Sequence, residues 1–253
     1  MKKSLLAVAA LFSLSGVAAA ADMPVKAPIP TPGCANFGGF YVGGHGAWNG
    51  YQTRRNDPNG YTSVGGPQIS GTSYTESNNN FGGGVQAGYN FQGPGRCTLW
   101  GVEADWSWMN AKTSTDVELG NLVDHGVRSK ANWVSTVRGR AGFVVENMLL
   151  YLTGGVAFAD IQTEFRHTHP VTPFADYVNF SDRRVGGAVG AGIEVALTNN
   201  LSLKSEVLYM NFGSWTHSYS APVVHFGAAP LNQFSFSFND NVWSSRFGLN
   251  YRF

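Results

Sequence analysis

The last twelve residues of the chain, VWSSRFGLNYRF at positions 242 to 253, alternate between two kinds of side chain. In an extended strand such alternation places large apolar residues on one face and polar residues on the other. The apolar face receives Trp243, Phe247, Leu249, Tyr251 and Phe253. The opposite face receives Arg246 and Arg252. Chain ends usually fray, so an aromatic residue at the terminus itself predicts a final strand that is held in place.

Seven earlier segments repeat this two-residue period, which gives eight predicted strands in all. They cover residues 38–48, 81–92, 98–109, 132–144, 149–159, 184–197, 201–212 and 242–253. Each is about 11 to 14 residues long, whereas strands of globular proteins usually have about five or six residues. A tilted strand that crosses a bilayer needs roughly 9 to 11 residues. The segment lengths therefore favour membrane-crossing strands.

The connections between these segments alternate in length. Three are short, with the sequences GPGRC, VENM and TNN, and the other four run about 32, 22, 24 and 29 residues. Short turns at one end and long loops at the other are typical of bacterial outer-membrane barrels, whose short turns lie in the periplasm. We therefore predict an all-β fold, an eight-stranded antiparallel transmembrane β-barrel with short periplasmic turns and long extracellular loops. A soluble sandwich with one wet face is the alternative.

The charged residues inside the predicted strands share one face. They are Glu103, Asp105, Arg138, Arg140, Glu194, Lys204, Glu206 and Arg246, with Arg252 on the same face near the chain end. An unpaired buried charge costs several kcal/mol, so we expect the acids and bases to pair within the lumen. Glu103 and Asp105, two residues apart, have a spacing that could serve acid/base chemistry, but the nearby cations favour a salt-bridged plug.

The first 21 residues have the composition of a secretory signal peptide: Lys2 and Lys3, an apolar run, and small alanines at a cleavage-like site. A membrane-anchoring helix is the alternative. Residues 22–36 are proline-rich and predict an extended periplasmic linker, and residues 37–253 form the barrel domain. Without the two lysines, 15 basic and 16 acidic residues remain. No basic stripe indicates a nucleic-acid partner.

Two cysteines, Cys34 and Cys97, precede the first predicted strand and follow the second. Antiparallel neighbours bring these two positions to the same periplasmic rim, in an oxidising compartment where a disulfide is permitted. We expect a structural disulfide, and two free thiols or another partner are the alternatives.

Chemistry-bearing motifs are scarce, and we expect no enzyme. The chain has no Walker-type phosphate loop and no HExxH, CxxC or GxSxG motif. Five of its six histidines fall in the predicted outer loops. His125, His167 and His169 are the candidates for holding a metal ion or an iron porphyrin. The alternative is that polar loops simply contain histidine, and no cofactor is then required.

The residues also resemble a known family. The stretches ADMPVKAP (21–28), GGFYVGGHGAW (38–48), LTGGVAFADI (152–161) and LSLKSEVLYMNFG (201–213), with the terminal aromatic residue, are similar to the outer-membrane immunogenic and haemin-binding small barrels of rhizobial and related alphaproteobacteria. The resemblance covers the strands of essentially the whole mature chain. It implies an OmpA-like barrel in the outer membrane of a Gram-negative bacterium, with structural and surface-antigen roles, and for some relatives haem binding or modest porin activity.

The family resemblance also assigns a role to the C-terminus. Arg246, Gly248, Tyr251 and Phe253 match the terminal signal that the barrel assembly machinery reads in such proteins. The expected partners are this machinery during biogenesis, and outer-membrane lipid and lipopolysaccharide afterwards. The expected function is a structural barrel with a lumen filled by side chains. The alternatives are a haem- or metal-binding surface receptor and a small porin.

Overall fold

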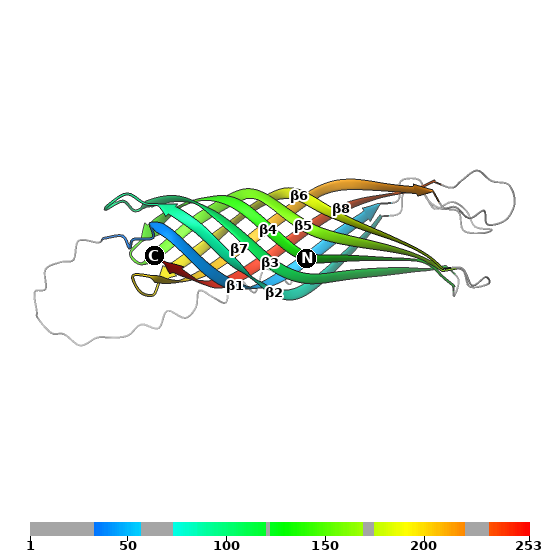
Figure 1. Ribbon diagram of the computed structural model, residues 1–253, viewed down its shortest axis with the longest axis horizontal. Coiled ribbons are helices and arrows are strands. Elements are labelled where there is room, and N and C mark those ends of the chain that lie inside the picture. The colour runs from blue at the N-terminus through cyan, green and yellow to red at the C-terminus, as the bar shows by residue number, and fades with distance from the viewer. Residues whose placement is uncertain (1–32, 57–72, 120–121, 169–174, 221–232) are drawn as a thin grey trace, which may run out of the picture. The chain divides into compact units, whose positions relative to one another are not determined.

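The computed structural model describes residues 33–56, 73–119, 122–168, 175–220 and 233–253. Eight antiparallel strands close into one barrel, each strand paired with its neighbours in sequence (Figure 1). The strands are β1 (Gly39–Asn56), β2 (Ser73–Phe91), β3 (Thr98–Leu119), β4 (Leu122–Val145), β5 (Met148–Thr168), β6 (Ala175–Ala196), β7 (Leu201–Ser220) and β8 (Gln233–Arg252). The predicted fold class is confirmed. No helix in the described ranges has the length and apolar character to cross a membrane.

The chain end is held by the strand that closes the barrel. β8 pairs with β1 along a register that runs from Tyr41 opposite Arg252 to Asn56 opposite Ser237. The terminal residue continues this seam, because the Phe253 amide donates a hydrogen bond to the Phe40 carbonyl over 3.1 Å. Both backbone edges of β8 are thus paired, with β1 and with β7. This pairing explains why the C-terminal residues keep the alternating pattern of a strand up to the last position.

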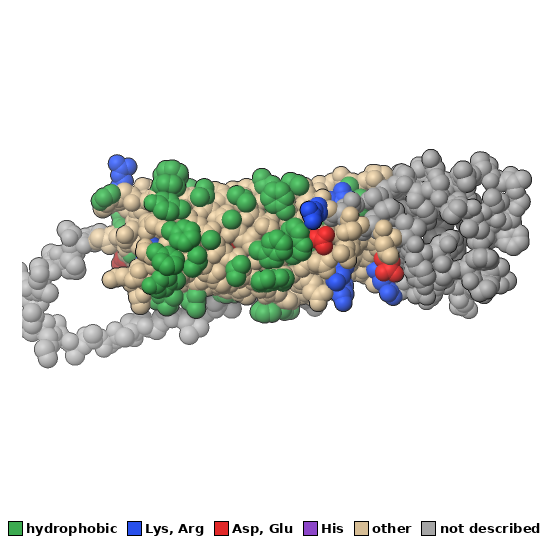
Figure 2. Space-filling view, viewed as in Figure 1, with side chains coloured by type: hydrophobic (Ala, Val, Ile, Leu, Met, Phe, Trp, Pro, Cys, Tyr) green, Lys and Arg blue, Asp and Glu red, His purple; other side chains and the backbone are tan. Residues whose placement is uncertain are grey.

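A belt of exposed apolar side chains surrounds the part of the barrel next to the short turns, and Figure 2 shows these side chains on one face. Its members include Phe40, Trp48, Phe81, Phe91, Trp100, Trp108, Phe143, Leu152, Phe158, Val189, Leu203, Trp243, Phe247 and Phe253. On β3 the belt runs from Trp100 to Trp108, about nine residues, which matches the length of a membrane-crossing strand. Aromatic rings stack across strands at both of its edges, Phe91 on Trp100 at 4.1 Å and Trp106 on Trp133 at 4.4 Å. Lipid is the solvent that suits this belt.

The strands are longer than the sequence predicted. They contain between 18 residues in β1 and 24 residues in β4, and they extend past the apolar belt at the end away from the short turns. Residues 49–56, 73–80, 110–119 and 122–131, which we expected in outer loops, are strand, as are residues 160–168, 175–183, 213–220 and 233–241. The physical reason is that hydrogen-bonded pairing continues beyond the membrane, where side chains no longer need an apolar outer face. Alternation of hydrophobicity therefore marked only the lipid-crossing part.

Residues 1–32 lie outside the described ranges. The predicted signal peptide at 1–21 and most of the predicted linker at 22–36 therefore remain predictions. Residues 33–36, at the end of that linker, are described and lie against the barrel. Cys34 and Ala35 pack on a buried cluster at its short-turn end, and the Ala35 amide donates to the Glu146 carbonyl over 2.7 Å. This stretch belongs structurally to the barrel domain.

Candidate functional site: the occluded lumen

The eight charged residues predicted for the lumen all lie inside it. β3, β4 and β7 supply two each, and β6 and β8 supply one each, because alternate residues of a strand face the same side. All eight are buried, with at most 4% of any residue exposed to solvent. The set is Glu103, Asp105, Arg138, Arg140, Glu194, Lys204, Glu206 and Arg246. It is called the charge network below.

Glu103 is the centre of the charge network. Its carboxylate lies 2.7 Å from Lys204 Nζ, 2.6 Å from Arg138 Nη2 and 3.4 Å from Arg140 Nη1. The Tyr41 hydroxyl donates a fourth interaction, over 2.6 Å. Both oxygens are therefore fully occupied. Three cations from β4 and β7 reach one carboxylate on β3, so this residue ties together strands that lie on different sides of the barrel.

The other carboxylates extend the charge network around the lumen. Arg138 reaches Asp105 at 3.1 Å and Glu206 at 3.1 Å, in addition to Glu103. Arg246 lies 2.9 Å from Asp105, and the Thr136 hydroxyl also donates to that carboxylate. Four acids meet four bases, so the charge network is neutral. Neutrality matters because each buried ion that lacked a partner would cost several kcal/mol.

Arg140 is held between two aromatic rings. Its guanidinium lies 5.1 Å from the Tyr41 ring centroid and 4.8 Å from that of Tyr151, distances typical of cation–π contact. Its Nη2 atom donates to Glu194 over 2.9 Å, and the Ser202 hydroxyl donates to the same carboxylate over 2.6 Å. The tyrosines, which sequence reasoning did not select, could have been found because they share the lumen face with the charges.

Apolar layers cover the charge network at both ends. Toward the outer ends of the strands, the lumen is filled by a buried cluster that includes Met109, Ala157, Leu208, Met210 and Val242. Toward the short turns, a second cluster consists of Phe37, Leu99, Val144, Leu149 and Tyr151. We expected a lumen filled by side chains, but the sequence did not indicate that the filling would be layered. The charge network therefore lies between two apolar layers, in a low-dielectric environment.

The segment before β1 closes the short-turn end of the barrel. Cys34 and Cys97 form a disulfide with a Cα–Cα distance of 5.4 Å, as expected. Phe37 is fully buried and is fixed by its backbone, since Gln92 Oε1 accepts from its amide over 2.7 Å and Asn90 donates to its carbonyl over 2.8 Å. The disulfide and these hydrogen bonds together hold an aromatic side chain in the mouth of the barrel.

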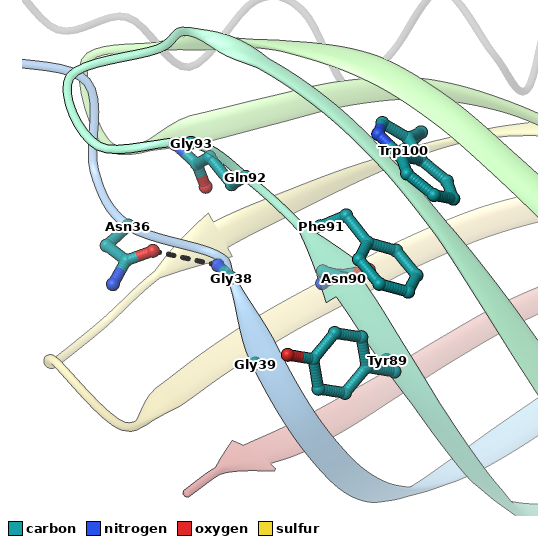
Figure 3. A pocket seen from close by; sticks show the side chains of 9 residues that line it. All are labelled: Asn36, Gly38, Gly39, Tyr89, Asn90, Phe91, Gln92, Gly93 and Trp100. Carbon is teal, nitrogen blue, oxygen red and sulfur yellow. Dashed lines mark hydrogen bonds between the residues drawn. The ribbon is translucent and has the colours of Figure 1, made fainter.

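A shallow hollow lies beside this closure, on the short-turn rim (Figure 3). Gly38 and Gly39 border it on one side, and the aromatic rings of Tyr89, Phe91 and Trp100 border it on the other. The Gly38 amide donates to the Asn36 side chain over 2.9 Å. Asn36, Asn90, Gln92 and Gly93 line the rest of the hollow, which lies at the edge of the apolar belt. It brings no charged group toward a ligand.

The histidine candidates fall only in part within the described residues. His125 on β4 and His167 on β5 are directly opposite each other in the register. Asp176 on β6 is opposite His167 in turn, so three potential metal ligands occupy one row across three strands. His169 lies outside the described ranges. His45, the one histidine predicted in a strand, is buried in the lumen between Gln86 at 3.0 Å and Ser107 at 2.9 Å.

The four residues of the predicted assembly signal occupy different environments. Arg246 is buried in the charge network, whereas Tyr251 and Phe253 are exposed in the apolar belt. Gly248 faces His45 and the Gly44 carbonyl so closely that a Cβ atom would lie 2.6 Å from that oxygen. The structure places these residues but does not test their recognition by an assembly machine, which stays a prediction.

Comparison with known proteins agrees with this geometry. A protein family described as the outer membrane protein beta-barrel domain matches residues 5–253. The chain is 31% identical to the 31 kDa outer-membrane immunogenic protein of Brucella melitensis, over 84% of this chain and 88% of that protein. It is 29% identical to the 22 kDa outer membrane protein of Rhizobium leguminosarum, over 82% and 83% of the two chains. Among solved structures, the outer membrane protease OmpT of Escherichia coli is similar in fold, with a TM-score of 0.51 at 10% identity over 85% and 97% of the chains.

Proposed function

This chain belongs to the outer membrane protein beta-barrel domain family, and on that premise we propose that it is a structural protein of the outer membrane whose lumen is permanently closed. The observation that supports this proposal is the layered filling of the lumen. Charged groups bridge the strands at mid-barrel, and apolar clusters cover them on both sides. A barrel of eight strands has just enough width for side chains to fill it.

The same layers disfavour the small-porin alternative. Water or a solute would have to displace Phe37 at one end, break the pairs of Glu103, and pass the outer apolar cluster. Each of these steps removes contacts that are buried from solvent. A porin of the same family needs an open aqueous path instead.

Planar-bilayer recording tests the closed lumen. We expect almost no steady conductance from the purified folded barrel, with or without a reducing agent, because the charge network remains after the disulfide is cut. Steady channel currents in the oxidised protein would contradict the proposal. A triple variant, Phe37→Ala/Glu103→Ala/Met210→Ala, serves as a positive control, since it removes a large side chain from each of the three layers.

The outer halves of the strands are the surface that this protein presents outside the cell. These halves extend away from the end of the barrel that carries the short turns and the C-terminus (Figure 1). The relatives from Brucella carry the name outer-membrane immunogenic protein, and we extend surface-antigen character to this chain. Antibodies raised against the folded barrel would then label intact cells of the source bacterium, and failure to label cells that contain the protein would contradict the assignment.

We also propose that the chain is not an enzyme. The chain is only 10% identical to the protease of similar fold, so this similarity shows a shared architecture and no shared activity. Each of the four carboxylates of the charge network has a cationic partner within 3.4 Å, so none of these four is poised for proton transfer to a substrate. Peptide-hydrolysis and lipid-hydrolysis assays of the folded barrel test this proposal, and turnover that survives careful removal of other envelope proteins would overturn it.

A second candidate function is metal or haem binding at the outer end of the barrel. The row of His125, His167 and Asp176 favours it, because the register places these three residues directly opposite one another across three neighbouring strands. Imidazole nitrogens and a carboxylate suit a transition metal or a haem iron. Haemin and Zn²⁺ titrations test the proposal with His125→Ala and His167→Ala, and His217→Ala on β7 is the control. Saturable binding lost only in the first two variants supports it, and absence of saturable binding contradicts it.

A further inference from the structure

Three cations gather on the outer wall of the barrel just beyond the apolar belt. Lys112 lies on β3 and Arg128 and Lys130 lie on β4, and all three are at least partly exposed on the face that carries Trp108 and Trp133 further down the same strands. They line one hollow with a volume of about 550 Å³. The rest of its lining is polar and consists of Thr113, Ser114, Ser129, Gln162, Thr163, Glu164, Asn179 and Ser181. These cations are called the outer basic patch.

The register of the outer basic patch places like charges against each other. Lys112 is directly opposite Lys130, and Arg128 follows two residues along the same strand face. Like charges that face each other across a strand pair are destabilising. In the described part of the chain, Glu164 is the one acid that lines this hollow, opposite Arg128. Among the described lining residues, three cations therefore accompany one acid, and the patch has an excess of positive charge.

The height of the outer basic patch on the barrel indicates what neutralises it. Trp108 and Trp133 are opposite each other at the outer edge of the belt, where aromatic girdles mark the boundary between lipid tails and headgroups. Past the β-bulge that follows this pair, Ala111 opposite Ala131 is buried in the lumen, and Lys112 opposite Lys130 is the first described pair beyond the bulge on the outer face. Figure 2 shows basic and acidic side chains in this zone, between the green belt and the grey region. The cations thus lie at the level of headgroups.

We propose that the outer basic patch binds the phosphate groups of lipopolysaccharide, the phosphorylated glycolipid of the outer leaflet. Lysine and arginine donate charge-assisted hydrogen bonds to phosphate, and the serine, asparagine and glutamine side chains beside them can bond sugar hydroxyls. The girdle aromatics below contact the acyl chains. This inference rests on the proposed outer-membrane location, and it assigns β3 to β6 as the side of the barrel that faces bound lipopolysaccharide.

A binding titration in detergent tests the proposal without relying on cellular location. The folded barrel is immobilised in a nonionic detergent with EDTA, which removes the divalent cations that would otherwise neutralise the phosphates. Three probes are titrated separately: lipopolysaccharide, the same glycolipid after enzymatic dephosphorylation, and phosphatidylglycerol. Each cation near a membrane surface contributes roughly a fivefold factor in affinity. We therefore expect the variant Lys112→Gln/Arg128→Gln/Lys130→Gln to weaken lipopolysaccharide binding about a hundredfold.

Two control variants make the same kind of charge change elsewhere. Arg54→Gln removes an exposed cation from the outer part of β1, two strands away from β3, and Arg96→Gln removes one from the short turn before β3. Retained resistance to unfolding in SDS without heating shows that every variant is folded. Because binding is measured on folded protein in micelles, a negative result would leave the structural role of the barrel intact and remove only the lipid site.

The proposal is supported if the triple variant loses affinity while Arg54→Gln and Arg96→Gln retain it, and if dephosphorylation weakens binding by a similar factor. Equal affinity of the triple variant and the wild type overturns it. So does equal binding of the dephosphorylated glycolipid. Phosphatidylglycerol that binds as tightly as lipopolysaccharide, with the same dependence on the patch, would instead identify a general anionic-lipid site and overturn the assignment to the outer-leaflet glycolipid.

Discussion

Replacing Glu103 with glutamine is expected to destabilise the barrel, although the change keeps the shape of the side chain. Glu103 contacts Lys204, Arg138 and Arg140, all buried. Its loss leaves three acids for four bases. Removing one partner of a buried ion pair typically costs about 3–5 kcal/mol. Arg138 and Arg140 retain Asp105, Glu206 and Glu194, so we expect the lower end, about 3 kcal/mol.

The free energy of unfolding can be measured by urea titration of the barrel in lipid vesicles, followed by tryptophan fluorescence. Glu146→Gln, in the exposed turn between β4 and β5, removes a carboxylate charge that is in contact with water. This change should alter the free energy of unfolding by less than about 0.5 kcal/mol. A double variant, Glu103→Gln with Lys204→Met, restores neutrality. It should be more stable than the sum of its two single changes by about 0.5–3 kcal/mol.

Two results would refute this reasoning. If Glu103→Gln costs no more than Glu146→Gln, the charge network does not hold the lumen together. If the double variant equals the sum of the single variants, the contact of Glu103 with Lys204 at 2.7 Å carries no coupling energy. In either case the apolar layers, and not the ion pairs, would be the source of lumen stability.

Three further predictions concern the seam, the glycines and the disulfide. Phe253 is exposed, and its amide is hydrogen-bonded to the Phe40 carbonyl. Deleting it should slow assembly in a pulse-chase experiment more than it lowers the urea midpoint of the finished barrel. Normal assembly of the deletion variant would contradict the terminal signal. Gly248→Ala should destabilise the barrel by at least about 1 kcal/mol, because its Cβ atom would lie 2.6 Å from the Gly44 carbonyl oxygen. Gly187→Ala, whose Cβ atom would have no other atom within 4 Å, should be tolerated in the same assay. Reduction of Cys34–Cys97, which closes a 63-residue separation, should cost about 2–4 kcal/mol in the wild type and nothing in the Cys34→Ser/Cys97→Ser variant.

The lipid-crossing part of this fold was predictable because its two faces differ in chemistry. Around Trp100 to Trp108, apolar residues alternate with Glu103 and Asp105, so strand, face and charge network all follow from a period of two. The outer extensions have no such contrast. Stretches such as NGYQTRRN in β1 and SYTESNNN in β2 are polar on both faces. Polar sequence without periodicity reads as loop, even where backbone pairing continues.

In the lumen, the two-residue pattern of the sequence specifies which residues face inward but does not specify which of them contact each other. Parity along each strand placed all eight charges inside, and antiparallel order brought Cys34 to Cys97. The partners of each charge depend on the barrel's stagger, which the sequence does not specify. Phe37 lies outside the strands, in a segment whose path is set by the disulfide. The outer basic patch was missed because its residues were assigned to loops.

The outer extensions also determine how an antibody can recognise this protein. Past Trp108, β3 continues for about 11 residues, which at roughly 3.3 Å per residue and a tilt of about 40° raises its tip roughly 25–30 Å above the girdle. Side chains that neighbour each other on these outer extensions come from different strands, as Lys112 on β3 and Lys130 on β4 do. An epitope there is assembled from several strands and disappears on boiling. Sera that bind the folded outer extensions should therefore fail on denaturing blots and on linear peptides.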